Sequence, residues 1–272
     1  MSVGKIPRLS ATCLERVGRF AYRARSSGGW CTHRALILVM LLLLLGASGE
    51  TVRAQEDLPA LIKKIQPAVV TIIGYSADDK HIRLGSGFFV SEDGQVITAW
   101  HVLQGVARAE LKLPRGERYP LTTVLAEDQK ADLLKLSVHI PGGTPFLKVA
   151  DIRPQVGEHV LVVGSPMGLE ESVSEGLVSA IRNIKDRGEF LQISAPISPG
   201  SSGGPVVNLQ GRVIGVAAFQ VRGQNINFAV LGGRILALRD GPPRPLVSHP
   251  DGQKSLPARP SIQVPLPQIR LP

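Results

Sequence analysis

Residues 199–205 read PGSSGGP, and the apolar stretch VVN follows them directly. A serine flanked by glycines suits a nucleophile, because glycines let the backbone present the hydroxyl and aim peptide N–H groups at one point, where an oxyanion can be held. A Gly/Ser-rich loop without chemistry is the alternative for this stretch alone. Ser202 is the candidate nucleophile, and the residues that it needs as partners lie upstream.

A histidine and an aspartate precede this serine in an order that suits catalysis. A serine hydroxyl is a weak nucleophile until a base takes its proton. His101 is the candidate base, at the end of the strand-like VITAWHV (residues 96–102). Asp132 opens another apolar run 31 residues later, and His, Asp, Ser is a known chain order for this geometry. A buried carboxylate there would hold the imidazole in one tautomer. Asp128 is a rival for that role.

The segment around these residues has the texture of an all-β protein. One helix is predicted over residues 57–65, where apolar residues recur at helical spacing. After it, short runs rich in Val, Ile and Leu alternate with turn signals such as SEDGQ (91–95), which indicates hairpins. Periodicity leaves one sandwich and two small barrels open. The runs lie at residues 69–73, 87–90, 95–99, 160–163, 177–181, 212–218 and 227–230.

The first 54 residues read as a targeting leader. They hold eight Lys and Arg against two Asp and Glu, so six of the nine net positive charges belong to them. The charge-free run at residues 35–49 is shorter than the roughly 20 apolar residues of a spanning helix, which favours a signal peptide. Retention as a short membrane anchor is the alternative. Without the leader the chain carries no basic stripe, so we expect no nucleic-acid partner.

The cysteines and the tail complete the predicted organisation. Cys13 and Cys31 both lie in the leader, so the rest of the chain can enter an oxidising compartment without a thiol. Residues 55–240 are predicted to form the folded domain. Residues 241–272 include nine prolines among 32 residues and show no apolar period, which predicts a disordered tail.

Five stretches of the folded segment carry a resemblance to a known family. They are GSGFFVSEDGQVITAWHV (85–102), ADLLKL (131–136), VGSPMGLEESVSEGLVSAIRN (163–183), LQISAPISPGSSGGPVVN (191–208) and NFAV (227–230). Through them the chain resembles the HtrA family of trypsin-like serine proteases over most of residues 58–230.

The resemblance implies an all-β fold of two six-stranded antiparallel β-barrels of chymotrypsin type, with a short N-terminal helix. It implies His101 and Asp132 from the first barrel and Ser202 from the second, with the backbone N–H groups of Gly200 and Ser202 as the oxyanion hole. No metal and no cofactor are expected. The implied activity is that of an exported endopeptidase, periplasmic or otherwise extracytoplasmic, acting on unfolded or misfolded polypeptides. Trimers are common among its members, which leaves a homotrimer open.

The chain departs from the family pattern in three places. Ser201 stands where the family usually has Asn, and Lys135 stands at a usually apolar position after Asp132, so that either the strand is shortened or the aspartate is displaced. Members commonly carry PDZ domains after the protease, and we expect residues 241–272 not to form one. A catalytically silent peptide-binding or scaffolding module with the same fold is therefore the alternative function.

Specificity is predicted from the residues that would line the substrate pocket. Cleavage after Lys or Arg needs a carboxylate at the pocket base, and APIS (195–198) before the nucleophile supplies none. With Ala195, Val216, Ala217 and Ala218 as the expected pocket residues, we predict cleavage after small or medium apolar side chains.

Overall fold

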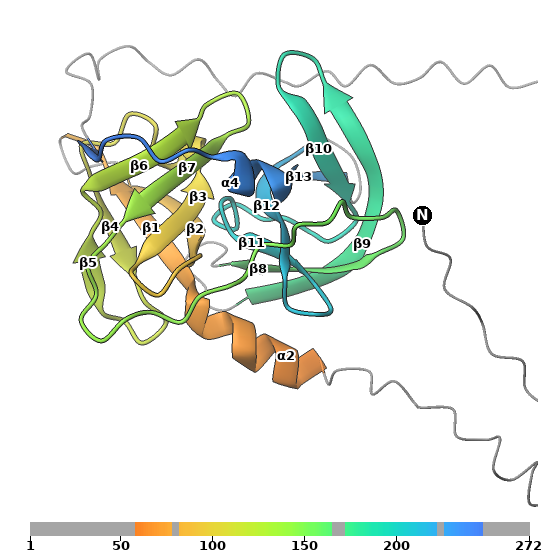
Figure 1. Ribbon diagram of the computed structural model, residues 1–272, viewed down its shortest axis with the longest axis horizontal. Coiled ribbons are helices and arrows are strands. Elements are labelled where there is room, and N and C mark those ends of the chain that lie inside the picture. Colours follow the sequence, from red (N-terminus) through yellow and green to blue (C-terminus); the bar gives the residue numbers. More distant parts are fainter. Residues whose placement is uncertain (1–57, 78–81, 165–171, 222–225, 247–272) are drawn as a thin grey trace, which may run out of the picture. The chain divides into compact units, whose positions relative to one another are not determined.

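Most of the regular secondary structure in the described part of the chain is β-strand (Figure 1). The computed structural model describes residues 58–77, 82–164, 172–221 and 226–246. The expected leader, residues 165–171 within the family-like stretch 163–183, and the tail beyond residue 246 lie outside the described residues.

A short helix precedes the strands, as the apolar spacing predicts. Helix α2 (Leu58–Ile65) continues into one 3-10 turn, η1 (Gln66–Ala68). Leu61 and Ile65 are buried, because they lie four positions apart and so share the face that meets the rest of the protein. The helix predicted over residues 57–65 is confirmed.

An eight-stranded antiparallel sheet forms the first half of the fold. Its strand order is β14-β6-β7-β3-β2-β1-β4-β5. The connection from β2 to β3 is the hairpin predicted at SEDGQ: Gly94 adopts a φ of 86°, and the Val90 N–H donates to the Gln95 carbonyl at 2.9 Å. The strands are β1 (Val69–Tyr75), β2 (Ile82–Phe89), β3 (Gln95–Ala99), β4 (Arg108–Lys112), β5 (Arg118–Pro120), β6 (Thr123–Asp128), β7 (Leu133–Ser137) and β14 (Arg244–Pro245).

A closed six-stranded barrel forms the second half, in the order β10-β13-β12-β11-β8-β9. Strands β9 and β10 make a long hairpin that stands out in Figure 1. The strands are β8 (His159–Gly164), β9 (Ser172–Ile184), β10 (Gly188–Ile193), β11 (Pro205–Asn208), β12 (Val213–Gln220) and β13 (Asn227–Leu231). Two short helices complete the fold, α3 (Trp100–Leu103) after β3 and α4 (Gly233–Ala237) after β13.

The prediction of two closed barrels is right for the second sheet and wrong for the first. The first sheet is curled but open, with β5 and β14 at its edges. Strand β5 has only three residues, and Pro120 lacks the N–H that a closing ladder needs. On the other edge, β6 pairs with β14, so its outer side is already occupied. The folded part thus extends to residue 246, beyond the boundary predicted at Asp240.

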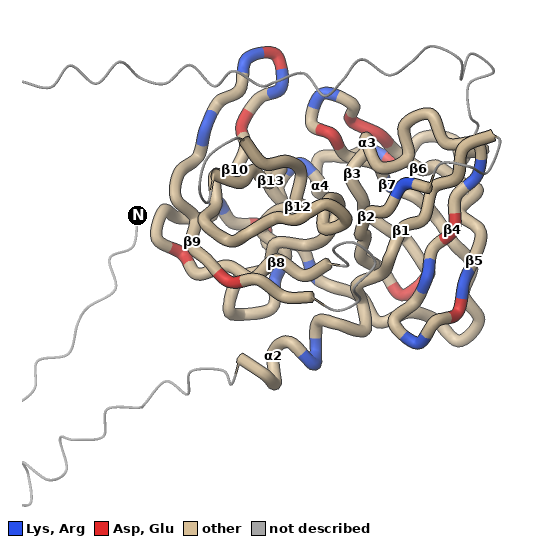
Figure 2. The backbone as a smooth tube through the Cα atoms, turned by 180° about the vertical axis from the view of Figure 1, so that it is seen from behind, with Lys and Arg blue, Asp and Glu red and all other residues tan. Residues whose placement is uncertain are grey.

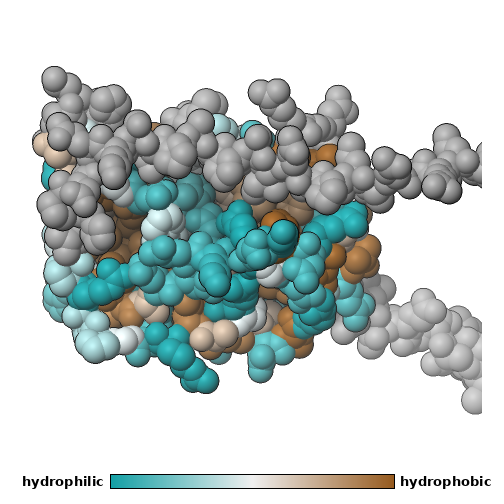
Figure 3. Space-filling model, turned by 90° about the horizontal axis from the view of Figure 1, so that it is seen from above, coloured by the Kyte–Doolittle hydropathy of each residue, from teal (hydrophilic) through white to brown (hydrophobic). Residues whose placement is uncertain are grey.

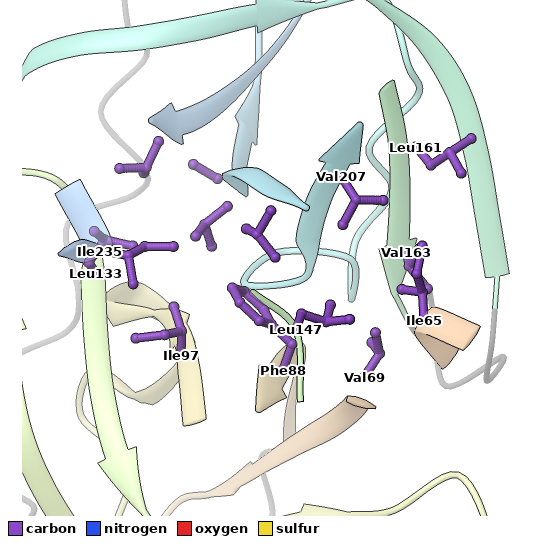
Figure 4. Packing of buried hydrophobic residues seen from close by; sticks show 14 of the residues in the cluster. Ile65, Val69, Phe88, Ile97, Leu133, Leu147, Leu161, Val163, Val207 and Ile235 are labelled. Carbon is purple, nitrogen blue, oxygen red and sulfur yellow. The ribbon is translucent and has the colours of Figure 1, made fainter. Parts of the chain in front are cut away.

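One hydrophobic cluster joins the two sheets, and Figure 4 shows its packing. Phe88 of β2 and Leu133 of β7 lie in the same cluster as Val163 of β8 and Val207 of β11. All four side chains are fully buried, and each such burial contributes about 1.5–3 kcal/mol. This seam between the sheets is flanked in sequence by the candidate residues: His101 follows β3, Asp132 precedes β7 and Ser202 precedes β11.

The surface of the described residues is polar and mixed in charge. Lys and Arg alternate with Asp and Glu over both sheets (Figure 2), and the face drawn in Figure 3 is largely hydrophilic with small apolar areas between. None of the described helices is long and apolar enough to cross a membrane.

Candidate active site

His101 and Asp132 form a direct pair. The Nδ1 of His101 lies 2.7 Å from Oδ2 of Asp132, and the backbone N–H of His101 donates to Oδ1 at 2.9 Å. Asp132 is buried, while the histidine ring is partly exposed. Both carboxylate oxygens are therefore committed to one residue, which fixes the orientation of the ring and places a proton on Nδ1. The other ring nitrogen, Nε2, is left to act as a base.

The backbone presents Asp132 in an unusual conformation. Its φ is 65°, in the left-handed region that few residues other than glycine adopt but that Asp and Asn tolerate. The Asp132 carbonyl accepts from the Trp100 N–H at 3.2 Å, which joins the end of β3 to the start of β7. The hydrogen bonds with residues 100 and 101 hold the carboxylate where the histidine needs it.

Asp128, the rival carboxylate, supports this turn instead. Its Oδ1 accepts from the Ala131 N–H at 2.9 Å, and its Oδ2 lies 2.6 Å from a guanidinium nitrogen of Arg234. Partial burial alone would raise the pKa of Asp128, but the Ala131 N–H and the Arg234 charge outweigh it and hold that pKa below its ordinary value. Asp128 thus ties the turn before Asp132 to α4.

Lys135 is accommodated without displacing Asp132. Strand β7 begins at Leu133, and the ammonium group of Lys135 reaches Oδ1 of Asp240 at 2.8 Å. The departure from the usual apolar pattern is therefore met by an ion pair at the end of the chain segment that follows α4.

Ser202 lies in the loop between β10 and β11 and is buried. Its hydroxyl donates to the Ala218 carbonyl of β12 at 3.2 Å, and its own carbonyl accepts from the Ser86 N–H at 2.8 Å. The next amide, Gly203 N–H, donates to the Ala217 carbonyl at 2.7 Å. The nucleophile loop is thus held between the two sheets.

Two glycines show how closely the sheets approach at this loop. A Cβ on Gly85 would lie 2.5 Å from Cγ1 of Val102 and 3.2 Å from the Ser202 carbonyl oxygen. A Cβ on Gly203 would lie 2.2 Å from the Ser86 carbonyl oxygen. The serine loop therefore packs against β2, and Gly85 of β2 lies close both to this loop and to α3, the short helix that carries His101.

The candidate oxyanion donors belong to the same loop. Gly200 has a φ of 98°, and its carbonyl accepts from the Ser86 hydroxyl at 2.7 Å. The Ser201 N–H donates to the Ser198 carbonyl at 2.9 Å. Among the hydrogen bonds between described residues, the N–H groups of Gly200 and Ser202 donate none, so both are available to a developing oxyanion.

The expected pocket residues divide between two clusters. Ala195 and Ala217 pack in a cluster formed mainly by the strands of the closed barrel, whereas Val216 and Ala218 pack in the seam cluster. All four are buried. Their side chains therefore do not form one wall, and Ala218 contacts the nucleophile through its carbonyl. The prediction of cleavage after small or medium apolar residues therefore rests on the lack of a carboxylate among residues 195–198.

Sequence reasoning missed two residues beside the site. The half-buried guanidinium of Arg187 lies over the rings of Phe190 and Phe219 at 4.9 and 5.1 Å, and it donates to the Lys130 carbonyl at 3.1 Å. Burial lowers the pKa of Arg187, and the charge of the nearby Asp132 opposes that shift. Ser86 is the other missed residue, and its position between two glycines inside an apolar run is the one signal that the sequence offered.

Comparisons with known proteins find similarity to trypsin-like serine proteases. Residues 85–216 match the family model described as "Trypsin-like peptidase domain". The chain is 37% identical over 212 residues to the mitochondrial serine protease HTRA2 of Bos taurus, which covers 72% of this chain and 45% of that protein. It is 36% identical over 171 residues to a probable periplasmic serine endoprotease, DegP-like, of Chlamydia pneumoniae, covering 58% of this chain and 35% of that protein.

A solved structure shares the architecture. The crystal structure of the serine endoprotease from Yersinia pestis superposes with a TM-score of 0.59 at 26% identity, covering 66% of this chain and 64% of that one.

Serine protease HTRA1A of Danio rerio is 36% identical over 190 residues, covering 64% of this chain and 39% of that protein. The chain spans less than half the length of the curated relatives named here.

Proposed function

We propose that the chain is a serine endopeptidase of the HtrA type that hydrolyses peptide bonds through an acyl-enzyme on Ser202. The observation that carries the proposal is the His101–Asp132 pair, whose 2.7 Å contact leaves the far ring nitrogen of His101 able to act as a base. Similarity to serine proteases named HTRA1A, HTRA2 and DegP-like supports it.

The proposed mechanism assigns one task to each residue. The Ser202 hydroxyl turns from the Ala218 carbonyl, at a cost near the net value of one hydrogen bond, about 0.5–1.5 kcal/mol. Nε2 of His101 takes its proton as the oxygen attacks the substrate carbonyl. Asp132 stabilises the imidazolium, and the N–H groups of Gly200 and Ser202 bind the oxyanion. His101 then protonates the leaving amine, and water releases the acyl group by the same steps in reverse order.

The proposed substrates are unfolded or misfolded polypeptides, cut after small or medium apolar residues. Such side chains are exposed mainly in unfolded chains. The lack of a carboxylate among residues 195–198 and 216–218 supports apolar over basic specificity. The proposed location is periplasmic or otherwise extracytoplasmic, supported by the basic and apolar leader and by the DegP-like relative.

One observation favours the alternative of a catalytically silent module. In the structure the Ser202 hydroxyl donates its hydrogen bond to the Ala218 carbonyl of β12. A chain that kept this arrangement when substrate arrived would bind peptides without cleaving them. The two functions differ in whether the hydroxyl can be acylated.

Labelling of the full chain with a fluorophosphonate, followed by digestion of an unfolded protein, separates these functions. We expect the wild type to label and to cleave, and Ser202→Ala to do neither. Ser91→Ala, in the turn between β2 and β3, serves as a matched serine control and should label like the wild type. A folded wild-type chain that neither labels nor cleaves would leave the silent module as the function.

A further inference from the structure

The buried Ser86 of β2 joins the first sheet to the nucleophile loop at two points. Its hydroxyl donates to the Gly200 carbonyl at 2.7 Å, and its backbone N–H donates to the Ser202 carbonyl at 2.8 Å. Gly200 and Ser202 are also the residues whose own N–H groups form the candidate oxyanion hole. One residue of the first sheet therefore contacts both donor residues of the second.

These two hydrogen bonds restrain the peptide planes that control the donors. The Gly200 carbonyl belongs to the peptide between residues 200 and 201, which lies between the two peptides that carry the donor N–H groups. Because each peptide is planar, its orientation sets the angle between those donors through the torsions on either side. Gly200 has a φ of 98° and no side chain, so it needs an external contact to stay in one conformation.

Ser86 is itself held in place. Its carbonyl accepts from Oγ1 of Thr98 in β3 at 2.7 Å, and its side chain is fully buried. A Cβ on Gly164 would lie 2.9 Å from the Ser86 hydroxyl oxygen, and one on Gly204 would lie 3.3 Å from the Ser86 Cβ. The Ser86 side chain is therefore closely packed by Gly164 and Gly204 next to its acceptor on Gly200.

We propose that Ser86 is a positioning residue, whose hydroxyl fixes the 200–201 peptide and so aims the two oxyanion donors. This inference rests on the proposed peptidase function for its effect on the reaction. An oxyanion hole binds charge that develops only in the transition state. Donors that point away from the oxyanion therefore lower kcat and leave KM unchanged. Removing one donor outright costs about 10²–10³-fold in kcat, and we expect about 10–100-fold for donors that are present but misaimed.

The test compares Ser86→Ala with Thr144→Val in the full chain. Thr144 is a matched control, because it is also buried and its Oγ1 also donates to a backbone carbonyl, that of Ser91 at 2.9 Å. Both variants should lose a similar few degrees of Tm. Only Ser86→Ala should lose about 10–100-fold in kcat on a peptide with an apolar cleavage residue, with KM within about twofold. An unchanged kcat, or an equal loss in both variants, would overturn the proposal.

Amide hydrogen exchange tests the positioning without any catalysis. In Ser86→Ala, the Ser201 and Gly203 amides of the nucleophile loop should exchange at least about tenfold faster than in the wild type, and in Thr144→Val they should not. If exchange rises while the wild type shows no labelling, Ser86 positions the loop and the peptidase function fails. Unchanged exchange in Ser86→Ala overturns the positioning role whatever the activity.

Discussion

Replacing Asp132 with Asn changes the charge of the pair and little else. Asn tolerates the left-handed backbone at this position, where φ is 65°, so the turn can keep its shape. The amide oxygen can still accept from the His101 backbone N–H, which now binds Oδ1 at 2.9 Å. The amide NH₂ then faces the ring nitrogen that Oδ2 contacts at 2.7 Å.

This substitution reverses the tautomer of the histidine. An NH₂ group donates, so Nδ1 must accept and the ring proton moves to Nε2. A protonated Nε2 cannot take the proton from Ser202. We expect kcat to fall by about 10³–10⁴-fold, or about 4–5.5 kcal/mol, which is the scale of losing the orienting carboxylate in such a triad. The free energy of unfolding should change by about 1 kcal/mol or less, because Asn has the size of Asp and can keep both hydrogen-bond contacts of this buried side chain.

The assay follows cleavage of an apolar peptide and the rate of fluorophosphonate labelling, with Tm measured on the same samples. Asp132→Ala is the control for backbone strain, because alanine is disfavoured at this φ and should lower Tm more than Asn does. The reasoning is refuted if Asp132→Asn retains more than about a tenth of the wild-type kcat. It is equally refuted if activity is lost only together with a large fall in Tm.

Two further predictions concern the turn and the loop. Asp128→Asn should lower the free energy of unfolding at pH 7 by at most about 1 kcal/mol, because the Asp128–Arg234 pair is partly exposed. The difference in Tm between the wild type and this variant should close as pH falls below the ordinary Asp pKa of 3.8. The difference should close in acid because a carboxyl group whose pKa is lowered in the folded state stabilises the fold only while it is ionised. A Tm difference that widens in acid would contradict the Asp128–Arg234 ion pair. Gly203→Ala should abolish labelling and destabilise by more than about 3 kcal/mol, because φ is 88° and the new Cβ meets the Ser86 carbonyl. Gly116→Ala, with a φ of 99° and open space, isolates the strain alone at about 1–2 kcal/mol, and an equal loss in both would contradict the steric argument.

The strands that the sequence predicted are those with local signals. The run at residues 95–99 coincides with β3, because an Asp-Gly turn marks its start and four β-favouring or small residues, VITA, follow Gln95. Strand β4 has a weaker signal: RAELK alternates polar and apolar residues, but only Ala109 and Leu111 are apolar, and no Gly or Pro directly precedes its start. The open first sheet was missed for a related reason, since closure depends on pairing between the edge strands, β5 and β14, that no local pattern encodes.

Some residues of the candidate site could be predicted from the sequence, and others could not. His101, Asp132 and Ser202 were identified from residue type and order, because each role demands a particular side chain. The choice between Asp132 and Asp128 depended on the backbone, since only the structure shows which carboxylate faces the ring and which binds the Ala131 N–H. Ser86 lies within one of the family-like stretches, but the sequence assigns it no role, because its acceptor on Gly200 lies 114 residues away in sequence.

The division of the site between two sheets makes its geometry depend on how they pack. The proposed base and its carboxylate lie beside strands of the first sheet, and the proposed nucleophile lies beside a strand of the second. Two contacts cross between the sheets close to these groups: the Ser86 hydrogen bonds to the nucleophile loop, and Arg187, which stacks on rings of the barrel while it donates to the Lys130 carbonyl. A shift of one sheet over the other would move Ser202 relative to His101 and would break the same hydrogen bonds that aim the oxyanion donors. We therefore expect the proposed base and the proposed oxyanion donors to depend on the same contacts and to be lost together.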